Sequence, residues 1–145
     1  MKRILLVDDE PGILQALRII LTGKGYEVET AWSTKEAWGI LDQDNFDLVV
    51  TDFNMPGMKG DELARLIKER WPKFPVVMLS GSVEILRASG RALPGVDALI
   101  GKPFNMIEFC GEIARLLEEA SAFANRGSEA AWSSTRHGEL AARVI

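Results

Sequence analysis

The sequence predicts an α/β protein, a doubly wound three-layer sandwich whose parallel sheet has five strands and is covered by five helices. The main observation is that short apolar runs alternate with segments of helical period through most of the 145 residues. Three of these runs, at 4–7, 46–51 and 76–79, are apolar almost throughout, as strands covered on both faces require. Strict strand–helix alternation also favours parallel pairing through right-handed crossovers.

The composition is that of an ordinary globular domain, with 47% hydrophobic and 26% charged residues. A net charge of -4 gives no support for nucleic-acid binding through a basic surface. The apolar runs are far shorter than the roughly 20 residues of a membrane span, and the N-terminus lacks the pattern of a signal peptide. The only cysteine, Cys110, cannot form an internal disulfide. These features predict a cytoplasmic protein.

The first half of the chain predicts two strands and two helices. A strand at 3–7 leads into a helix that begins near Pro11, where the first helical turn tolerates proline. The segment 26–30 alternates apolar and acidic residues, which is typical of a half-exposed strand. Ser33 and Glu36 form a capping box for the second helix.

The second half predicts three further strands and three helical segments, followed by a tail. In order they lie at 46–52, 61–70, 76–79, 82–94, 97–100 and in a helix that begins at Asn105. The helix at 82–94 is expected to be short or loose because glycine and proline interrupt it. Residues 1–122 are expected to form the domain, and residues 123–145 a tail that is partly disordered or packs onto a partner.

Functional side chains follow the predicted strands where each strand ends. Asp8 and Asp9 follow the first strand, Asp52 closes the third, Ser80 closes the fourth and Lys102 follows the fifth. The carboxyl ends of parallel strands lie along one edge of the sheet, where α/β proteins bind ligands. We therefore expect these five side chains to form one site.

Three neighbouring carboxylates repel one another, so one must be protonated or a cation must lie among them. Oxygen ligands without nearby Cys or His favour Mg²⁺. In the alternative interpretation Asp8 and Asp9 only cap the helix at Pro11, but Asp52 and Lys102 at other strand ends favour the site. With a lysine and the hydroxyl of Ser80, the set suggests phosphoryl transfer to Asp52 as nucleophile.

With these residues in this order, residues 2–122 resemble the receiver domain of two-component response regulators. The residues that carry the resemblance are Asp8-Asp9, Asp52 with the loop Asn54-Met55-Pro56-Gly57-Met58-Lys59-Gly60, Ser80-Gly81 and Lys102-Pro103-Phe104. The resemblance implies a flavodoxin-like sheet of strand order 2-1-3-4-5. It also implies that Asp52 accepts a phosphoryl group from a histidine kinase or a histidine phosphotransfer protein.

The resemblance further implies a role for each site residue. Asp9, Asp52 and the main-chain carbonyl of Asn54 would ligate Mg²⁺, and Asp8 would act largely through water. Ser80 and Lys102 would bind phosphoryl oxygens, and receivers commonly have a cis peptide before the proline that follows this lysine.

The expected output is a contact with an unknown downstream protein through the surface at roughly 82–117, because no DNA-binding domain is expected in the chain. Whether phosphorylation causes dimerisation is left open. The only chemistry expected is self-phosphorylation and self-dephosphorylation, so the protein would not be an enzyme with an external substrate.

Two other classes of protein remain open. One is an interaction module with the same fold that is never phosphorylated. The other is a Mg²⁺-dependent phosphohydrolase with an aspartyl nucleophile. Enzymes of the haloacid-dehalogenase class usually have an acid two residues after the nucleophile, and here that position is Asn54, which weighs against the hydrolase.

Leu99 departs from the receiver pattern, because receivers usually carry Tyr or Phe three residues before the lysine, as part of the switch. We hypothesise that the output relies instead on movement between Ser82 and Gly95, or on the tail. Leu99→Tyr should then leave phosphorylation-dependent partner binding unchanged, as measured by pull-down with beryllofluoride. Markedly stronger binding would contradict the hypothesis.

Overall fold

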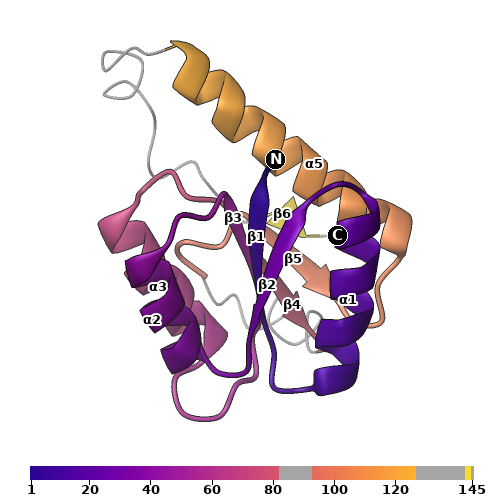
Figure 1. Ribbon diagram of the computed structural model, residues 1–145. Coiled ribbons are helices and arrows are strands. Elements are labelled where there is room, and N and C mark those ends of the chain that lie inside the picture. Colours follow the sequence, from indigo (N-terminus) through magenta and orange to yellow (C-terminus); the bar gives the residue numbers. More distant parts are fainter. Residues whose placement is uncertain (82–92, 127–142, 145) are drawn as a thin grey trace.

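The computed structural model describes residues 1–81, 93–126 and 143–144, with side chains described as far as Ala122 (Figure 1). Its elements in chain order are β1 (Arg3–Val7), α1 (Pro11–Gly23), β2 (Glu27–Ala31), α2 (Thr34–Gln43), β3 (Leu48–Asp52), α3 (Gly60–Arg70), β4 (Val76–Ser80), β5 (Ala98–Gly101), α5 (Met106–Arg126) and β6 (Arg143–Val144). None of the described helices is long and apolar enough to cross a membrane.

The sheet is parallel throughout, in the order β2-β1-β3-β4-β5-β6. The first five strands confirm the predicted order. The sixth was not predicted: Arg143 pairs with Ala98, and Val144 pairs with Leu99. Four of the five predicted helices lie in the described part of the chain, whereas the predicted fourth helix falls mainly on residues 82–92, outside it.

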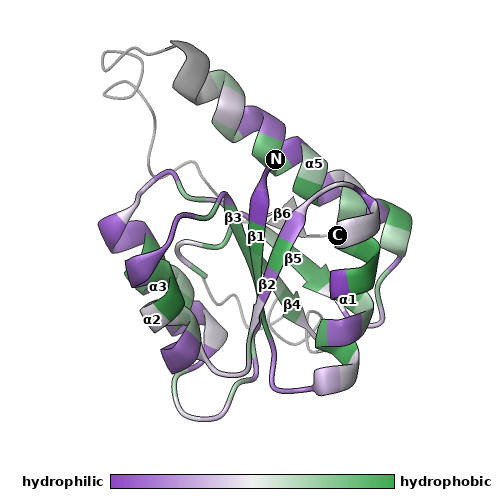
Figure 2. Cartoon of the chain, viewed as in Figure 1, coloured by the Kyte–Doolittle hydropathy of each residue, from purple (hydrophilic) through white to green (hydrophobic). Residues whose placement is uncertain are grey.

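The sheet is the middle of three layers, with α1 and α5 on one face and α2 and α3 on the other (Figure 1). Alternate residues of each strand serve the two faces: Ile4 and Leu6 pack toward α1 and α5, whereas Leu5 and Val7 pack toward α2 and α3. All four are buried. Burying one such side chain stabilises the fold by roughly 1.5–3 kcal/mol, and Figure 2 shows the hydrophobic residues concentrated on the strands and the sheet-facing sides of the helices.

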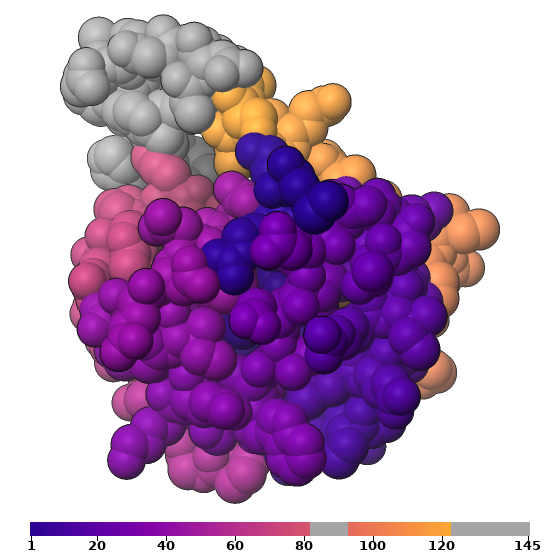
Figure 3. Space-filling view, in the orientation of Figure 1, coloured from indigo at the N-terminus to yellow at the C-terminus, as the bar shows by residue number. Residues whose placement is uncertain are grey.

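Side-chain caps begin two of the helices where the sequence predicts them. The Ser33 hydroxyl accepts a hydrogen bond from the Glu36 amide at 3.0 Å, and the Glu36 carboxylate accepts one from the Trp32 amide at 2.6 Å. Before α5, the Asn105 side-chain oxygen accepts hydrogen bonds from two amides of the first turn, at 2.8 and 3.1 Å. The helix continues to Arg126, past the expected domain boundary at 122, and its C-terminal part extends beyond the sheet (Figure 1). In the space-filling view, the part of α5 drawn in orange stands out at the top of the domain (Figure 3).

Asp97 fixes the start of β5 against its neighbours. Its carboxylate accepts hydrogen bonds from the Lys68 ammonium on α3 and from the Val76 amide on β4, both at 2.8 Å. Just before it, Gly95 adopts a φ of +89° and lies so close to α3 that a Cβ there would be 2.9 Å from the Ala64 carbonyl oxygen. The N-terminal end of β5 is therefore held by α3 and β4 together. The predicted site residue Lys102 follows the opposite, C-terminal end of the strand.

Candidate functional site

The acidic group predicted from the strand ends is present. Asp8 and Asp9 follow β1, Asp52 ends β3, and one carboxylate oxygen from each lies within 4.8 Å of the other two. Asp8 and Asp52 are 2% and 7% exposed, whereas Asp9 is exposed to solvent. Two nearly buried acids beside a third, exposed one form a pocket that is open on the side of Asp9.

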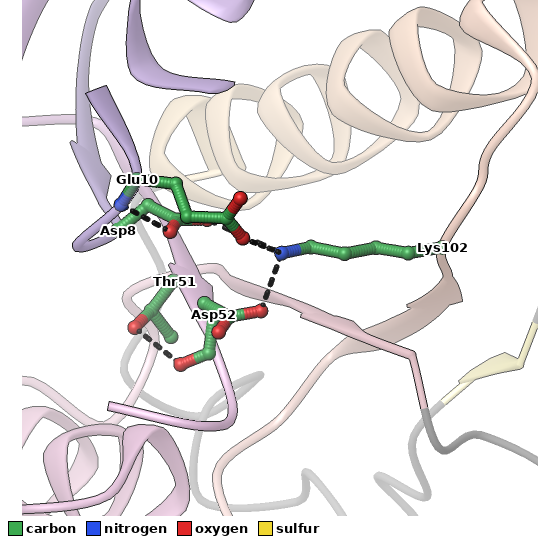
Figure 4. Close-up of polar contacts among 5 residues, drawn as sticks. All are labelled: Asp8, Glu10, Thr51, Asp52 and Lys102. Carbon is green, nitrogen blue, oxygen red and sulfur yellow. Dashed lines mark hydrogen bonds and ion pairs between the residues drawn. The ribbon is translucent and has the colours of Figure 1, made fainter. Parts of the chain in front are cut away.

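Lys102 reaches into this pocket from the end of β5 (Figure 4). Its ammonium nitrogen lies 2.9 Å from the Asp52 carboxylate, 3.3 Å from Asp8 and 3.9 Å from Glu10. The backbone of the lysine is fixed because its amide donates to the Ser80 carbonyl at 2.8 Å. The Lys102–Pro103 peptide is cis, as expected.

Burial and charge act in opposite directions on the two members of this ion pair. Burial raises the pKa of the Asp52 carboxyl above its ordinary value, Lys102 partly offsets the rise, and Asp8 and Asp9 add to it. Burial by itself would lower the pKa of Lys102, but the contacts with Asp52 and Asp8 outweigh burial and raise it. Lys102 is therefore held as a cation, while the negative charge on Asp52 is only partly compensated.

The loop after Asp52 is tied down at several points. Thr34 donates from its hydroxyl to the Met58 carbonyl at 2.9 Å, and the Gly60 amide donates to the Phe53 carbonyl at 3.0 Å. Met55 is buried in the core, and Gly57 has a φ of +76°, which suits the residue after proline in a tight turn. The backbone on the far side of Asp52 is thus held independently of the acids.

Gly60 is the point of closest approach in this loop. A Cβ on Gly60 would overlap the main-chain oxygen of Asp52 and lie 3.0 Å from its carbonyl carbon. Only glycine therefore lets α3 begin directly beneath the site. Gly60 belongs to the loop that carries the receiver resemblance, but the need for glycine comes from a contact with the preceding strand, which the local sequence does not indicate.

The remaining predicted residues occupy different surroundings. Ser80 is fully buried at the end of β4, one residue beyond Leu79, which pairs with Asp52. Asn54 is exposed in the loop. Leu99 is buried on the face covered by α2 and α3 and pairs with Met78, so it lies inside the sheet and not among the acids.

Glu10 is a member of the site that sequence analysis missed. Its amide donates to the Asp8 carboxylate at 3.0 Å, and its own carboxylate is the one 3.9 Å from Lys102. The signal was its position directly after Asp8 and Asp9, on the approach to α1. Glu10 is exposed, so its attraction for Lys102 is screened by water.

The donor set suits a hard divalent cation. Asp8, Asp9 and Asp52 offer oxygen atoms alone, and no described histidine or cysteine belongs to the group. Mg²⁺ prefers such ligands and keeps several waters, for which the exposed side at Asp9 leaves room. A cation among these three carboxylates would also balance the part of their negative charge that Lys102 does not compensate.

The fold and this acidic pocket agree with the comparisons to known proteins. The profile of the response regulator receiver domain family matches residues 4–114. The chain therefore belongs to the receiver-domain family of two-component signalling, whose members are typically signalling proteins and not enzymes.

Three relatives illustrate the relationship. The chain is 35% identical over 144 residues to response regulator GtcR of Aneurinibacillus migulanus, an alignment that covers 96% of this chain and 57% of that protein. This chain thus spans little more than half the length of that relative. Two solved structures are similar: response regulator TrrA of Thermotoga maritima in complex with Mg²⁺-BeF (34% identity, TM-score 0.70, 80% of this chain and 99% of that one) and a CheY-like receiver domain protein of Methanospirillum hungatei (32%, 0.74, 84% and 98%).

Gly60→Ala should lower the free energy of unfolding by about 1–3 kcal/mol, because the added methyl group overlaps main-chain atoms that cannot move without displacing Asp52. Gly39→Ala in α2 is the matched control, since a Cβ there meets nothing within 4 Å and alanine favours helix. Urea unfolding measures both. Equal stability of the two variants would contradict the constraint at Gly60.

Asp52→Asn should raise the free energy of unfolding at pH 7 in EDTA, because burial disfavours the charged carboxylate and not the neutral amide. The raised pKa of Asp52 means that the folded protein binds the proton more tightly than the unfolded chain, so its stability falls as pH rises through the window above the ordinary value. The advantage of the variant should vanish below about pH 3.9, where the carboxyl is neutral in both states.

Added Mg²⁺ should make the wild type more stable than Asp52→Asn. The cation stabilises the wild type in proportion to its occupancy, whereas the variant lacks one of its ligands. Urea unfolding with EDTA or Mg²⁺ measures both effects. Glu118→Gln, a change to an exposed acid on α5, is the control and should show neither. If Asp52→Asn proves less stable in EDTA, the ion pair with Lys102 outweighs burial.

Proposed function

We propose that the protein is a phosphoacceptor of a phosphorelay, in which Asp52 receives a phosphoryl group from a histidine kinase or a histidine phosphotransfer protein. The observation that supports this most is the ammonium of Lys102, 2.9 Å from Asp52 and 3.3 Å from Asp8 in the same pocket. An ammonium in this position can pair first with the carboxylate of Asp52 and then with the negative oxygens of an entering phosphoryl group.

The transfer would proceed as an in-line displacement. An oxygen of Asp52 forms a bond to phosphorus while the bond from phosphorus to the donor's imidazole nitrogen breaks, and the electron pair stays on that nitrogen. Lys102 and Ser80 would bind the equatorial oxygens, where charge develops. Hydrolysis of the acyl phosphate by water returns the carboxylate and inorganic phosphate, so no external substrate is turned over.

The residues proposed to hold Mg²⁺ are Asp9, Asp52 and the main-chain carbonyl of Asn54, with Asp8 acting through water. When bound, the cation would neutralise charge on the phosphoryl oxygens. Asp8 also accepts a hydrogen bond from the Glu10 amide, which orients its carboxylate toward the pocket. The chain's own contribution is to fix these oxygens and the lysine before the donor arrives.

The output is proposed to pass through contacts with a downstream protein or with a second copy of the chain. The domain is proposed to comprise residues 1–122, and the surface facing the partner to lie between residues 82 and 117. Leu99 in place of an aromatic residue supports a route that does not depend on a rotating ring, because its side chain is enclosed between the sheet and two helices.

The test is incubation with Mg²⁺ and acetyl phosphate, followed by intact mass. The wild type should gain one base-labile phosphoryl group, and Asp52→Asn should gain none. Lys102→Ala should slow the gain by about 10²-fold or more, because it removes the charge that stabilises the transferring group. Lys24→Ala, at the distant end of α1, is the matched control and should react like the wild type.

Three other outcomes of this experiment would contradict the proposal. No gain in the wild type with any donor would indicate an interaction module that is not phosphorylated. Release of phosphate from many organic monoesters would indicate a phosphohydrolase. A gain that persists in Asp52→Asn would place the acceptor elsewhere.

A further inference from the structure

The outer edge of β5 carries a second segment of the chain. β5 pairs with β4 across four residues, Ala98 to Gly101, whereas in the described part of the chain only β6 pairs with its other side, at Ala98 and Leu99. An uncovered strand edge presents amide and carbonyl groups that can pair with any extended segment. The structure therefore places a short occupant on an edge that could accept a longer one.

We propose that the outer edge of β5 is a strand-addition site for an extended protein segment, and that β6 occupies it from within the same chain. Two residues of parallel pairing give few hydrogen bonds, so most of the occupancy derives from the tether: residues 127–142 join α5 to β6 and keep the segment at high effective concentration. A partner segment that pairs along all four residues of β5 would make more bonds and displace it.

The edge is linked to the pocket through two strands, and this part of the proposal rests on the proposed function. Leu99 lies between Met78 on β4 and Val144 on β6. Both β4 and β5 end in the site. The amide of Lys102, the residue after β5, donates to the carbonyl of Ser80, the last residue of β4. Movement of Ser80 and Lys102 toward a phosphoryl group on Asp52 would shift the end of β5, and phosphorylation would thereby release β6.

The backbone provides a reporter for the occupant. The Lys102 amide donates to the carbonyl of Ser80 on β4, and Ser80 pairs with Gly101. Since successive residues of a strand present their amides to opposite sides, the amides of Ala98 and Ile100 face β4, whereas the Leu99 amide faces the outer edge. Hydrogen exchange at Leu99 therefore reports on β6, and exchange at Ile100 reports on the rest of the sheet.

The first experiment removes the amides of β6. In the full chain, replacing Arg143 and Val144 together by proline should accelerate exchange at Leu99 by about tenfold or more, the ratio expected for one or two lost backbone hydrogen bonds. Ile100 should be unchanged. The matched control, both residues replaced by alanine, keeps the amides and should exchange like the wild type.

The second experiment supplies the occupant in trans. A synthetic peptide of residues 138–145, at millimolar concentration, should restore slow exchange at Leu99 in the proline variant, whereas the same peptide with proline at positions 143 and 144 should not. A wild-type Leu99 amide that exchanges as fast as in the proline variant would overturn the occupancy. If the peptide fails to slow this exchange, the strand-addition site is overturned. If exchange slows as a dimer appears in the mass measurement, the edge pairs between two copies of the chain.

The third experiment tests the release step. With Mg²⁺ and acetyl phosphate, exchange at Leu99 should accelerate several-fold in the wild type and stay unchanged in Asp52→Asn. A phosphoryl gain by intact mass without any change at Leu99 would overturn release while leaving the phosphoacceptor function standing. No phosphoryl gain would overturn that function and the release step together, and the peptide experiment would still decide the strand-addition site.

Discussion

The ion pair between Lys102 and Asp52 is the contact on which the rest of the site depends. Asp8 and Asp52 are nearly buried and face a third acid, an arrangement that is unfavourable without a cation. The lysine supplies one positive charge, and the raised pKa of Asp52 indicates that this charge is not enough. A buried pair of this kind is weak evidence for stability. It is better understood as an electrostatic arrangement that a divalent cation and a phosphoryl group would complete.

The framework around this pair is rigid where the chemistry requires it. β1 and β3 are buried on both faces, so the strand ends that carry Asp8 and Asp52 have little freedom to move. Gly60 allows α3 to start against the backbone of Asp52. At the opposite edge of the sheet, Asp97 fastens β5 to α3 and β4. Strand ends anchored in this way can hold a lysine and three acids at fixed distances without relying on contacts among the acids.

The residues of the pocket could be predicted because their positions follow from one topological rule. Once the alternation of strands and helices predicts a parallel sheet, Asp8, Asp52 and Lys102 must meet at one edge. The helix caps at Ser33 and Asn105 could also be predicted, since a cap depends only on residues close in sequence.

Features that depend on distant contacts could not be predicted in this way. Glu112 on α5 is charged, yet it is 6% exposed, a burial that depends on how the helix packs in the domain. Arg143 and Val144 have no strand pattern around them. They pair with the outer edge of β5, the side away from β4. The sequence around them does not indicate that this edge is available for pairing.

Leu99 connects these two kinds of feature. It departs from the aromatic residue usual in the family, so a rotating ring cannot carry the signal from the pocket. Like Ala98, it also pairs with both neighbouring strands, through Met78 on β4 and Val144 on β6. A buried aliphatic side chain transmits movement by displacing what packs and pairs with it, since close-packed interiors do not absorb such shifts. In this chain the consequence of a shift at Ser80 and Lys102 would therefore be felt along the backbone of β5, at the edge where β6 lies.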